Sequence, residues 1–289
     1  MIFSFCGEVI AMGKITPSDV YQQTDNVIAE IILIRKALNV QVAGKNPGLQ
    51  FNKKPLHVLT KSIELQEKIA TAQEKNNVKK TSLSVLPLRK ITPEDVLASA
   101  LHSLDGLRKL KAGLGINEII NDAPLIAGKS PSDVYENMWR ASYLMDAVSG
   151  AISPNDVFRN TKVIQADLKF ISEHLGVSPP DELPIFLEGM TPKDANIEGY
   201  KNLHRIYRLQ KNLKMQLVRV SDFPVGKASP SDVYDTTNTI LGELVRIKIK
   251  IGLNKSLESF ADFNEKTPSD VHKELRTIGI LIEQLTNSI

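Results

Sequence analysis

Cysteine, aromatic residues and long apolar runs are all scarce in this 289-residue chain. The single cysteine, Cys6, excludes an internal disulfide and a zinc–thiolate cluster. No run approaches the ~18 apolar residues of a membrane-spanning helix, so no integral membrane segment is expected. Although only 6% of the residues are aromatic, 42% are hydrophobic and 24% are charged. This composition is typical of a globular protein with a substantial core.

The first residues carry the only indication of cellular location. Residues 1–13, MIFSFCGEVIAMG, form a short apolar segment interrupted by Glu8. The segment lacks the basic start of a signal peptide, but it contains Cys6, so its removal would leave a chain without cysteine. We interpret residues 1–14 as a frayed N-terminus or the remnant of a secretory signal. A truncated signal would favour a periplasmic or secreted protein, and otherwise a cytoplasmic one is expected.

An internal repeat dominates the chain. The pentapeptide Thr/Ser-Pro-x-Asp-Val occurs eight times, counting one Asp-Ala variant at Thr191 and one decayed copy at Lys54. The copies begin at residues 16, 54, 92 and 130, and again at 153, 191, 229 and 267, with a step of 38 residues within each set. Adding 137 to a position in the first set gives its counterpart in the second. The spacing therefore predicts a tandem duplication, with units in residues 15–152 and 153–289.

Each copy of the pentapeptide is typical of a helix start. Serine or threonine is favoured at the N-cap, proline at the first helical position, and aspartate at the third, where it can close a capping box. These roles account for every repeated residue without a catalytic function. The predicted structural helix caps are Thr16, Asp19, Thr92, Asp95, Ser130, Asp133, Ser153, Asp156, Thr191, Asp194, Ser229, Asp232, Thr267 and Asp270.

Apolar residues follow the caps at alternating steps of four and three, as in Val20, Thr24, Val27, Ile31 and Ile34. This spacing is typical of helices packed at shallow angles. We predict an all-α fold of eight helices arranged as two tandem four-helix bundles, with one continuous eight-helix array as the alternative. Linkers of about 13 extended residues reach ~43 Å, enough to run back along a helix. They permit either antiparallel hairpins or successive parallel helices.

Motifs of catalysis and of metal or cofactor binding are not found. The five histidines are not three or four residues apart, as a helical metal site would require. The segment Ala127-Gly128-Lys129-Ser130 resembles the end of a phosphate-binding loop but lacks its first glycine. We therefore predict no catalytic, cofactor-binding or metal-ligating residue, and expect a protein that is not an enzyme.

Two features are candidates for binding. Lys201, Arg205, Arg208 and Lys211 fall at helical spacing and could bind an anion or an acidic partner, or simply form a solvated face. Nucleic acid is not favoured as a partner, because the net charge of the chain is only +3 and residues 153–289 hold equal numbers of basic and acidic residues. An aromatic residue follows the cap valine in four copies. These residues, which could line a pocket or seal the bundle ends with hydroxyls reaching water, are Tyr21, Tyr135, Phe158 and Tyr234.

These patterns favour a non-enzymatic sensor, adaptor or scaffold that presents helix faces and bundle ends, chiefly to another protein. The alternative is a carrier of an apolar small molecule in a bundle core. Small residues in the predicted core layers could leave room there, namely Thr24, Thr161, Thr237, Ala100 and Ala141. The sole tryptophan, Trp139, is expected at a rim or between the bundles.

Overall fold

A computed structural model describes residues 14–44, 46–180, 182–220, 222–223, 226–255 and 260–289. Regular structure in these ranges consists of eight helices without a strand, which confirms the predicted all-α fold. They are α1 (Pro17–Ala37), α2 (Pro55–Lys75), α3 (Pro93–Gly113), α4 (Pro131–Ser149), α5 (Pro154–Leu175), α6 (Pro192–Asn212), α7 (Pro230–Ile251) and α8 (Pro268–Ser288). None of these helices combines the length and apolar character needed to cross a bilayer. The expectation for residues 1–14 concerns a segment of which 1–13 lie outside the described residues.

Seven helices begin with the same hydrogen bonds. The cap residue donates its backbone N–H to the aspartate three residues later at 2.7–2.9 Å. The cap hydroxyl also donates to that carboxylate, so the aspartate accepts two hydrogen bonds. In α4, α6 and α8 the hydroxyl accepts the aspartate N–H in return, at 3.3 Å. A carboxylate in the first turn is further stabilised by the helix dipole.

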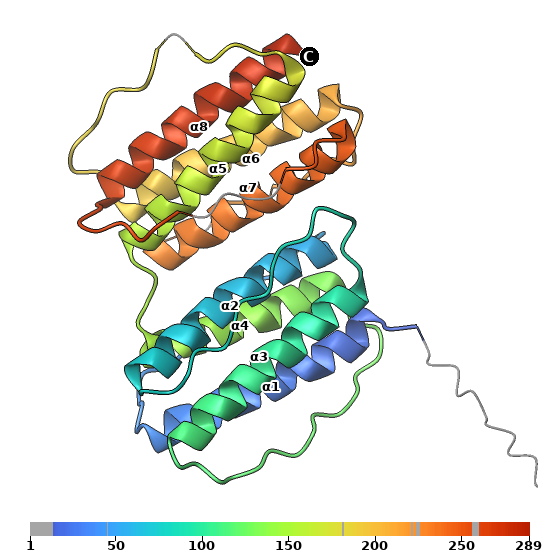
Figure 1. The fold of residues 1–289 in the computed structure, drawn as a ribbon, viewed down its shortest axis with the longest axis vertical. Coiled ribbons are helices and arrows are strands. Elements are labelled where there is room, and N and C mark those ends of the chain that lie inside the picture. Colours follow the sequence, from blue (N-terminus) through green and yellow to red (C-terminus); the bar gives the residue numbers. More distant parts are fainter. Residues whose placement is uncertain (1–13, 45, 181, 221, 224–225, 256–259) are drawn as a thin grey trace, which may run out of the picture.

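The helices pack in two groups of four, α1–α4 and α5–α8, called here the first and second bundle (Figure 1). Within each bundle every helix packs against two others. In the first bundle α1 and α2 both pack on α3 and α4, and in the second α5 and α6 both pack on α7 and α8. The buried apolar residues form one cluster in each bundle. The packing is consistent with the predicted bundles, which also touch each other through α2 and α7.

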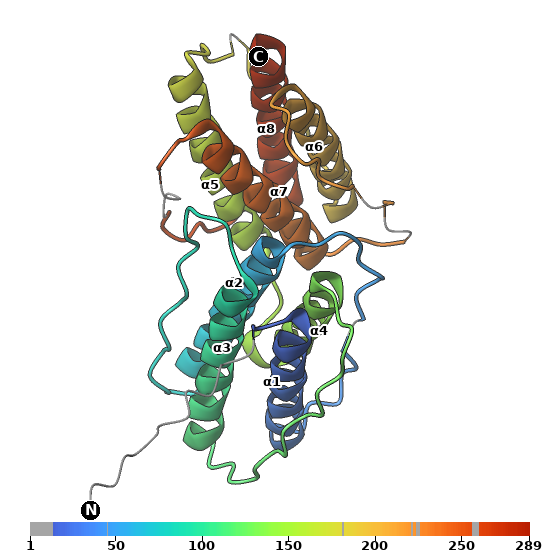
Figure 2. The same cartoon turned by 90° about the vertical axis from the view of Figure 1, so that its right-hand side faces the viewer.

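All four helices of a bundle run in the same direction. In the first bundle the N1 prolines and the cap valines of all four helices line one small hollow on the bundle axis. The corresponding residues of the second bundle do the same, with Ala195 in place of one valine. Four helix starts therefore meet at one end of each bundle, and each linker returns along the outside (Figures 1 and 2). This resolves the alternative that linker length alone left open.

Side chains in equivalent positions hold the returning linkers. Ser132 Oγ accepts the backbone N–H of Lys53 at 3.1 Å, and its counterpart Ser269 accepts that of Met190 at 3.0 Å. These serines occupy the variable position of the pentapeptide, between the proline and the aspartate. A position without a role in helix capping thus fixes the linker that precedes a neighbouring helix.

A buried ion pair recurs in the two bundles. Lys111 Nζ lies 2.6 Å from Glu30 and donates to a linker carbonyl at 2.8 Å. Its counterpart Lys248 lies 2.7 Å from Asp167 and donates to a linker carbonyl at 3.0 Å. Each pair joins the first helix of its bundle to the third and to the linker that follows. A buried charge requires such a partner, because burial without one is strongly unfavourable.

Candidate functional site

The bundles meet through α2 and α4 of the first and α7 of the second (Figure 1). Helices α2 and α7 lie against each other from their first turns to just past their midpoints, and they run in opposite directions. His57, early in α2, contacts Glu243, late in the shared stretch of α7, at 2.9 Å. Glu67, further along α2, accepts a hydrogen bond from Tyr234, near the start of α7, at 3.0 Å. Polar side chains thus join the bundles along this contact.

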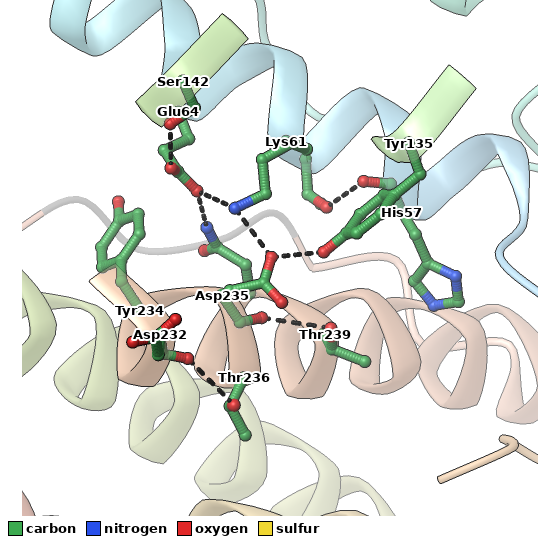
Figure 3. Close-up of polar contacts among 12 residues, drawn as sticks. His57, Lys61, Glu64, Tyr135, Ser142, Asp232, Tyr234, Asp235, Thr236 and Thr239 are labelled. Atoms are coloured by element: carbon green, nitrogen blue, oxygen red, sulfur yellow. Dashed lines mark hydrogen bonds and ion pairs between the residues drawn. The ribbon is translucent and has the colours of Figure 1, made fainter. Parts of the chain in front are cut away.

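Lys61 is the centre of the interface (Figure 3). It is 1% exposed, and its Nζ lies 2.6 Å from Glu64 and 2.7 Å from Asp235 of the other bundle. Tyr135 of α4 donates a short hydrogen bond to the same Asp235. Burial alone would lower the pKa of Lys61, but the two carboxylates raise it above its ordinary value. Lys61 is therefore a buried cation that joins the two bundles electrostatically.

The remaining polar atoms of Glu64 are also paired. Ser142 of α4 donates to one carboxylate oxygen at 2.6 Å, and Asn238 of α7 donates to the other at 3.2 Å (Figure 3). Lys68 follows one turn along α2 and pairs with Asp146 of α4 at 2.5 Å. Burial raises the pKa of Asp146, although Lys68 opposes the shift. The interface is therefore a connected hydrogen-bond network with its charges compensated.

His57 explains how α2 begins without the repeated aspartate. Its Nδ1 accepts the backbone N–H of Lys54 at 3.1 Å, so the imidazole takes the place of the capping carboxylate. Its Nε2 must then carry the proton that it donates to Glu243. Burial lowers the pKa of His57 and keeps the ring neutral. Burial alone would raise the pKa of Glu243, but the His57 donor, Arg246 and Gln210 lower it to about 2.

Two tyrosines extend the network on either side of Lys61. Tyr143 of α4 donates to Asp232, the capping aspartate of α7, at 2.9 Å. Tyr234 of α7 donates to Glu67, whose pKa is raised by burial despite the cation of Arg159. Burial also raises the pKa of both tyrosines, so both hydroxyls keep their protons as donors.

Two of the cavities that border this network are lined by its central residues. The first measures about 420 Å³ and is called here the aromatic cleft. Its lining comes from both bundles and includes Phe51, Trp139 and Tyr143 from the first and Tyr200, Asp232 and Thr236 from the second. The second, of about 440 Å³, is lined by Glu64, Tyr234 and Asn238 among others. Asp235 lines the cleft, so the buried network forms part of its wall.

The four aromatic residues that follow cap valines do not gather in one pocket. Tyr135 and Tyr234 are buried between the bundles, and their hydroxyls bond to carboxylates there. The expectation that such hydroxyls reach water is wrong for these two, because the second bundle covers one and the first covers the other. Phe158 packs edge-to-face on Phe263, with ring centroids 4.9 Å apart. Tyr21 lies half-buried beneath the ammonium of Lys129.

The candidate anion-binding residues lie on α6. Arg205 bonds to both Glu198 of α6 and Glu283 of α8, at 2.8 and 2.9 Å. Lys201 pairs with Glu198 at 3.0 Å, and Arg208 with Glu283 at 3.3 Å. Lys211, one turn further, is exposed. The structure therefore places three of the four cations in one ion-pair network with acids of α6 and α8.

Sequence reasoning named Tyr135 and Tyr234 but missed the charged residues of the interface. Trp139, expected at a rim or between the bundles, lines the cleft. The sequence carries little signal for the charged residues. Lys61, Glu64 and Lys68 are spaced three and four residues apart beside the apolar stripe of α2, a pattern that is also typical of a solvated face. All three are nevertheless buried, which lysine and glutamate rarely are without a partner. In the described part of the chain no group of three His, Cys, Asp or Glu side chains is placed to hold a metal ion. Comparison with family models, curated proteins and solved structures finds no match.

Proposed function

We propose that this protein is a non-enzymatic sensor or adaptor that binds a small molecule in the aromatic cleft. The observation that carries the proposal is the cleft itself, about 420 Å³ of space lined by side chains of both bundles. Cavities of this size are typical of small-molecule sites. Because the ligand would contact both bundles, its binding would favour one relative orientation of the two.

The lining indicates the ligand's chemistry. Trp139 and Tyr143 lie with their rings 5.7 Å apart, and Phe51 faces the same cleft, so a flat ring is the expected body of the ligand. Asn196 and Thr236 of the second bundle add polar groups to the lining. We therefore expect a ring-containing molecule with hydrogen-bonding groups on one edge.

The bundle cores are less suitable places for a ligand. The hollows on the two bundle axes measure about 20 and 10 Å³, close to the space that one water molecule needs. The small core residues also fill their layers. Thr24, Thr161 and Thr237 are buried, and each hydroxyl bonds to the carbonyl three residues earlier. The small-molecule alternative is thus better supported between the bundles than within them.

Trp139 provides the assay, because it is the only tryptophan and it lines the cleft. Nucleosides, aromatic amino acids and cyclic sugars are screened by thermal shift, and each hit is titrated by tryptophan fluorescence. Phe51→Ala should abolish both signals. Phe186→Ala is the matched control, since Phe186 is similarly exposed, 45% against 56%, but does not line the cleft. A hit that binds Phe51→Ala as well as the parent would contradict the proposal.

A further inference from the structure

The interface between the bundles uses a face that occurs twice in the chain. Adding 137 to residue numbers relates α2 and α4 of the first bundle to α6 and α8 of the second. The α2/α4 face is covered by α7. Its counterpart, called here the α6/α8 face, is formed by two helices that pack side by side. The first bundle packs on α7, the helix of the second bundle that lies nearest to it, and not on this face (Figures 1 and 2).

The side-chain geometry of the two faces matches, with the charges exchanged at two positions. Lys61 and Glu64, paired at 2.6 Å, correspond to Glu198 and Lys201, paired at 3.0 Å. One turn further, Lys68 and Asp146, paired at 2.5 Å between α2 and α4, correspond to Arg205 and Glu283, paired at 2.9 Å between α6 and α8. The α6/α8 face therefore has the framework of a helix-docking surface with a different charge pattern.

The difference between the faces lies in their exposure. The Glu64 side chain is buried, whereas that of its counterpart Lys201 is 58% exposed, as is that of Arg208. Tyr135, which bonds across to α7, corresponds to His272, whose buried Nδ1 has no hydrogen-bond partner within the described residues. The His272 side chain as a whole is only half-buried, whereas Tyr135 is 2% exposed.

We propose that the α6/α8 face docks one amphipathic helix of a protein partner, antiparallel to α6, as α7 docks on α2. A docked helix that complements the exchanged charges needs a cation opposite Glu198. In the interface between the bundles, Asp235 of α7 holds the equivalent position opposite Lys61. The docked helix also requires a carboxylate opposite Lys201, at the position of Asn238 three residues further along the docked helix, and another opposite Arg208. The partner helix is thus recognised by a cation that is followed three residues later by a carboxylate, with a second carboxylate opposite Arg208.

A second copy of the chain does not meet these requirements at the equivalent surface. The counterpart of α7 in the first bundle is α3, and Asp235, whose position must carry a cation opposite Glu198, corresponds there to Ala98. Leu101 takes the position of Asn238, which would face Lys201. The α3 surface therefore brings neither the cation nor the carboxylate that the α6/α8 face requires, and a different protein is the occupant that fits.

The test uses the full chain and a dye-labelled peptide derived from α7. The peptide has the sequence of Pro230–Ile251 with Asp235→Lys and Asn238→Glu, which place a cation opposite Glu198 and a carboxylate opposite Lys201. Fluorescence anisotropy should show saturable binding, about tenfold tighter than that of the unmodified α7 peptide. Binding should fall about tenfold in the protein variant with Lys201→Glu and Arg208→Glu.

The matched control carries Lys36→Glu and Lys169→Glu, which change the same charge at exposed positions of α1 and α5. It should bind the modified peptide like the parent, and circular dichroism should show that all variants are folded. Equal loss in the control, no preference for the modified peptide, or tighter binding of a DNA duplex at 150 mM salt would overturn the proposal. So would a dimer abolished by Lys201→Glu. Ligand binding in the aromatic cleft is measured separately by Trp139 fluorescence and does not depend on this face.

Discussion

Replacing Lys61 with methionine tests whether the buried network holds the two bundles together. Methionine keeps most of the aliphatic length of lysine but removes the ammonium that lies 2.6 Å from Glu64 and 2.7 Å from Asp235. Asp235 is then left in a buried site without its cation, and Glu64 keeps only the ammonium of Lys68, 3.6 Å away. Breaking a buried ion pair by removing one partner typically costs about 3–5 kcal/mol, since the remaining charge keeps its desolvation penalty.

Lys109→Met is the matched comparison. Lys109 makes the same kind of contact, 2.5 Å from Asp105, but both side chains are about half exposed, at 54% and 52%. Exposed pairs of this kind contribute about 0.3–0.5 kcal/mol. The same chemical change is therefore expected to cost several times more free energy at the interface than on the surface of α3.

Urea unfolding monitored in two ways separates loss of the interface from loss of the bundles. Trp139 fluorescence reports the interface, because the Lys61 ammonium lies 5.1 Å from the indole ring. Far-ultraviolet circular dichroism reports all eight helices. In Lys61→Met the fluorescence transition should move to lower urea and precede the loss of helix, because each bundle keeps its own core.

A triple variant tests whether the uncompensated carboxylates cause the loss of stability in Lys61→Met. Adding Glu64→Gln and Asp235→Asn to Lys61→Met removes the uncompensated charges and should recover most of the lost free energy. Two results would show that the network does not hold the bundles together. One is a difference of less than about 0.5 kcal/mol between the losses of unfolding free energy in Lys61→Met and Lys109→Met, which is the size of an exposed pair's contribution. The other is a triple variant that is less stable than Lys61→Met.

Three further predictions concern other parts of the fold. Burial keeps the pKa of folded His57 below its unfolded value of about 6.5. The contribution of neutral His57 to the free energy of unfolding should therefore be fully present above that pH and be lost as the pH falls through the folded pKa. Urea midpoints should be lower at pH 5 than at pH 7.5, and His57→Asn should reduce this difference. Ser132→Ala and Ser269→Ala each remove one linker hydrogen bond, so calorimetry should record similar losses of about 1 kcal/mol, and an effect confined to one bundle would refute their equivalence. Gly176 ends α5 at φ +69°, so Gly176→Ala should cost about 1 kcal/mol in urea unfolding, whereas Gly48→Ala, with open space around its Cα, should cost little.

The eight helices and their starts could be predicted from the sequence because the determinants are local. A cap, a proline and an aspartate act on backbone groups three residues away, so a pentapeptide is enough to begin a helix at Pro17 or Pro192. The core positions follow from the same logic, since apolar residues at steps of three and four lie on one side of a helix. Val27, Ile31 and Ile34, assigned to this stripe by spacing alone, are fully buried.

Helix direction and the contact between the bundles were decided only by the tertiary structure. The linkers are long enough for either direction, and the contacts that select parallel packing, such as Ser132 with Lys53, join residues 79 apart in the sequence. Lys61 and Asp235 come from different bundles, and neither belongs to a motif. Their pairing depends on the packing of two complete surfaces, because a buried charge is stable only where a distant segment supplies its partner.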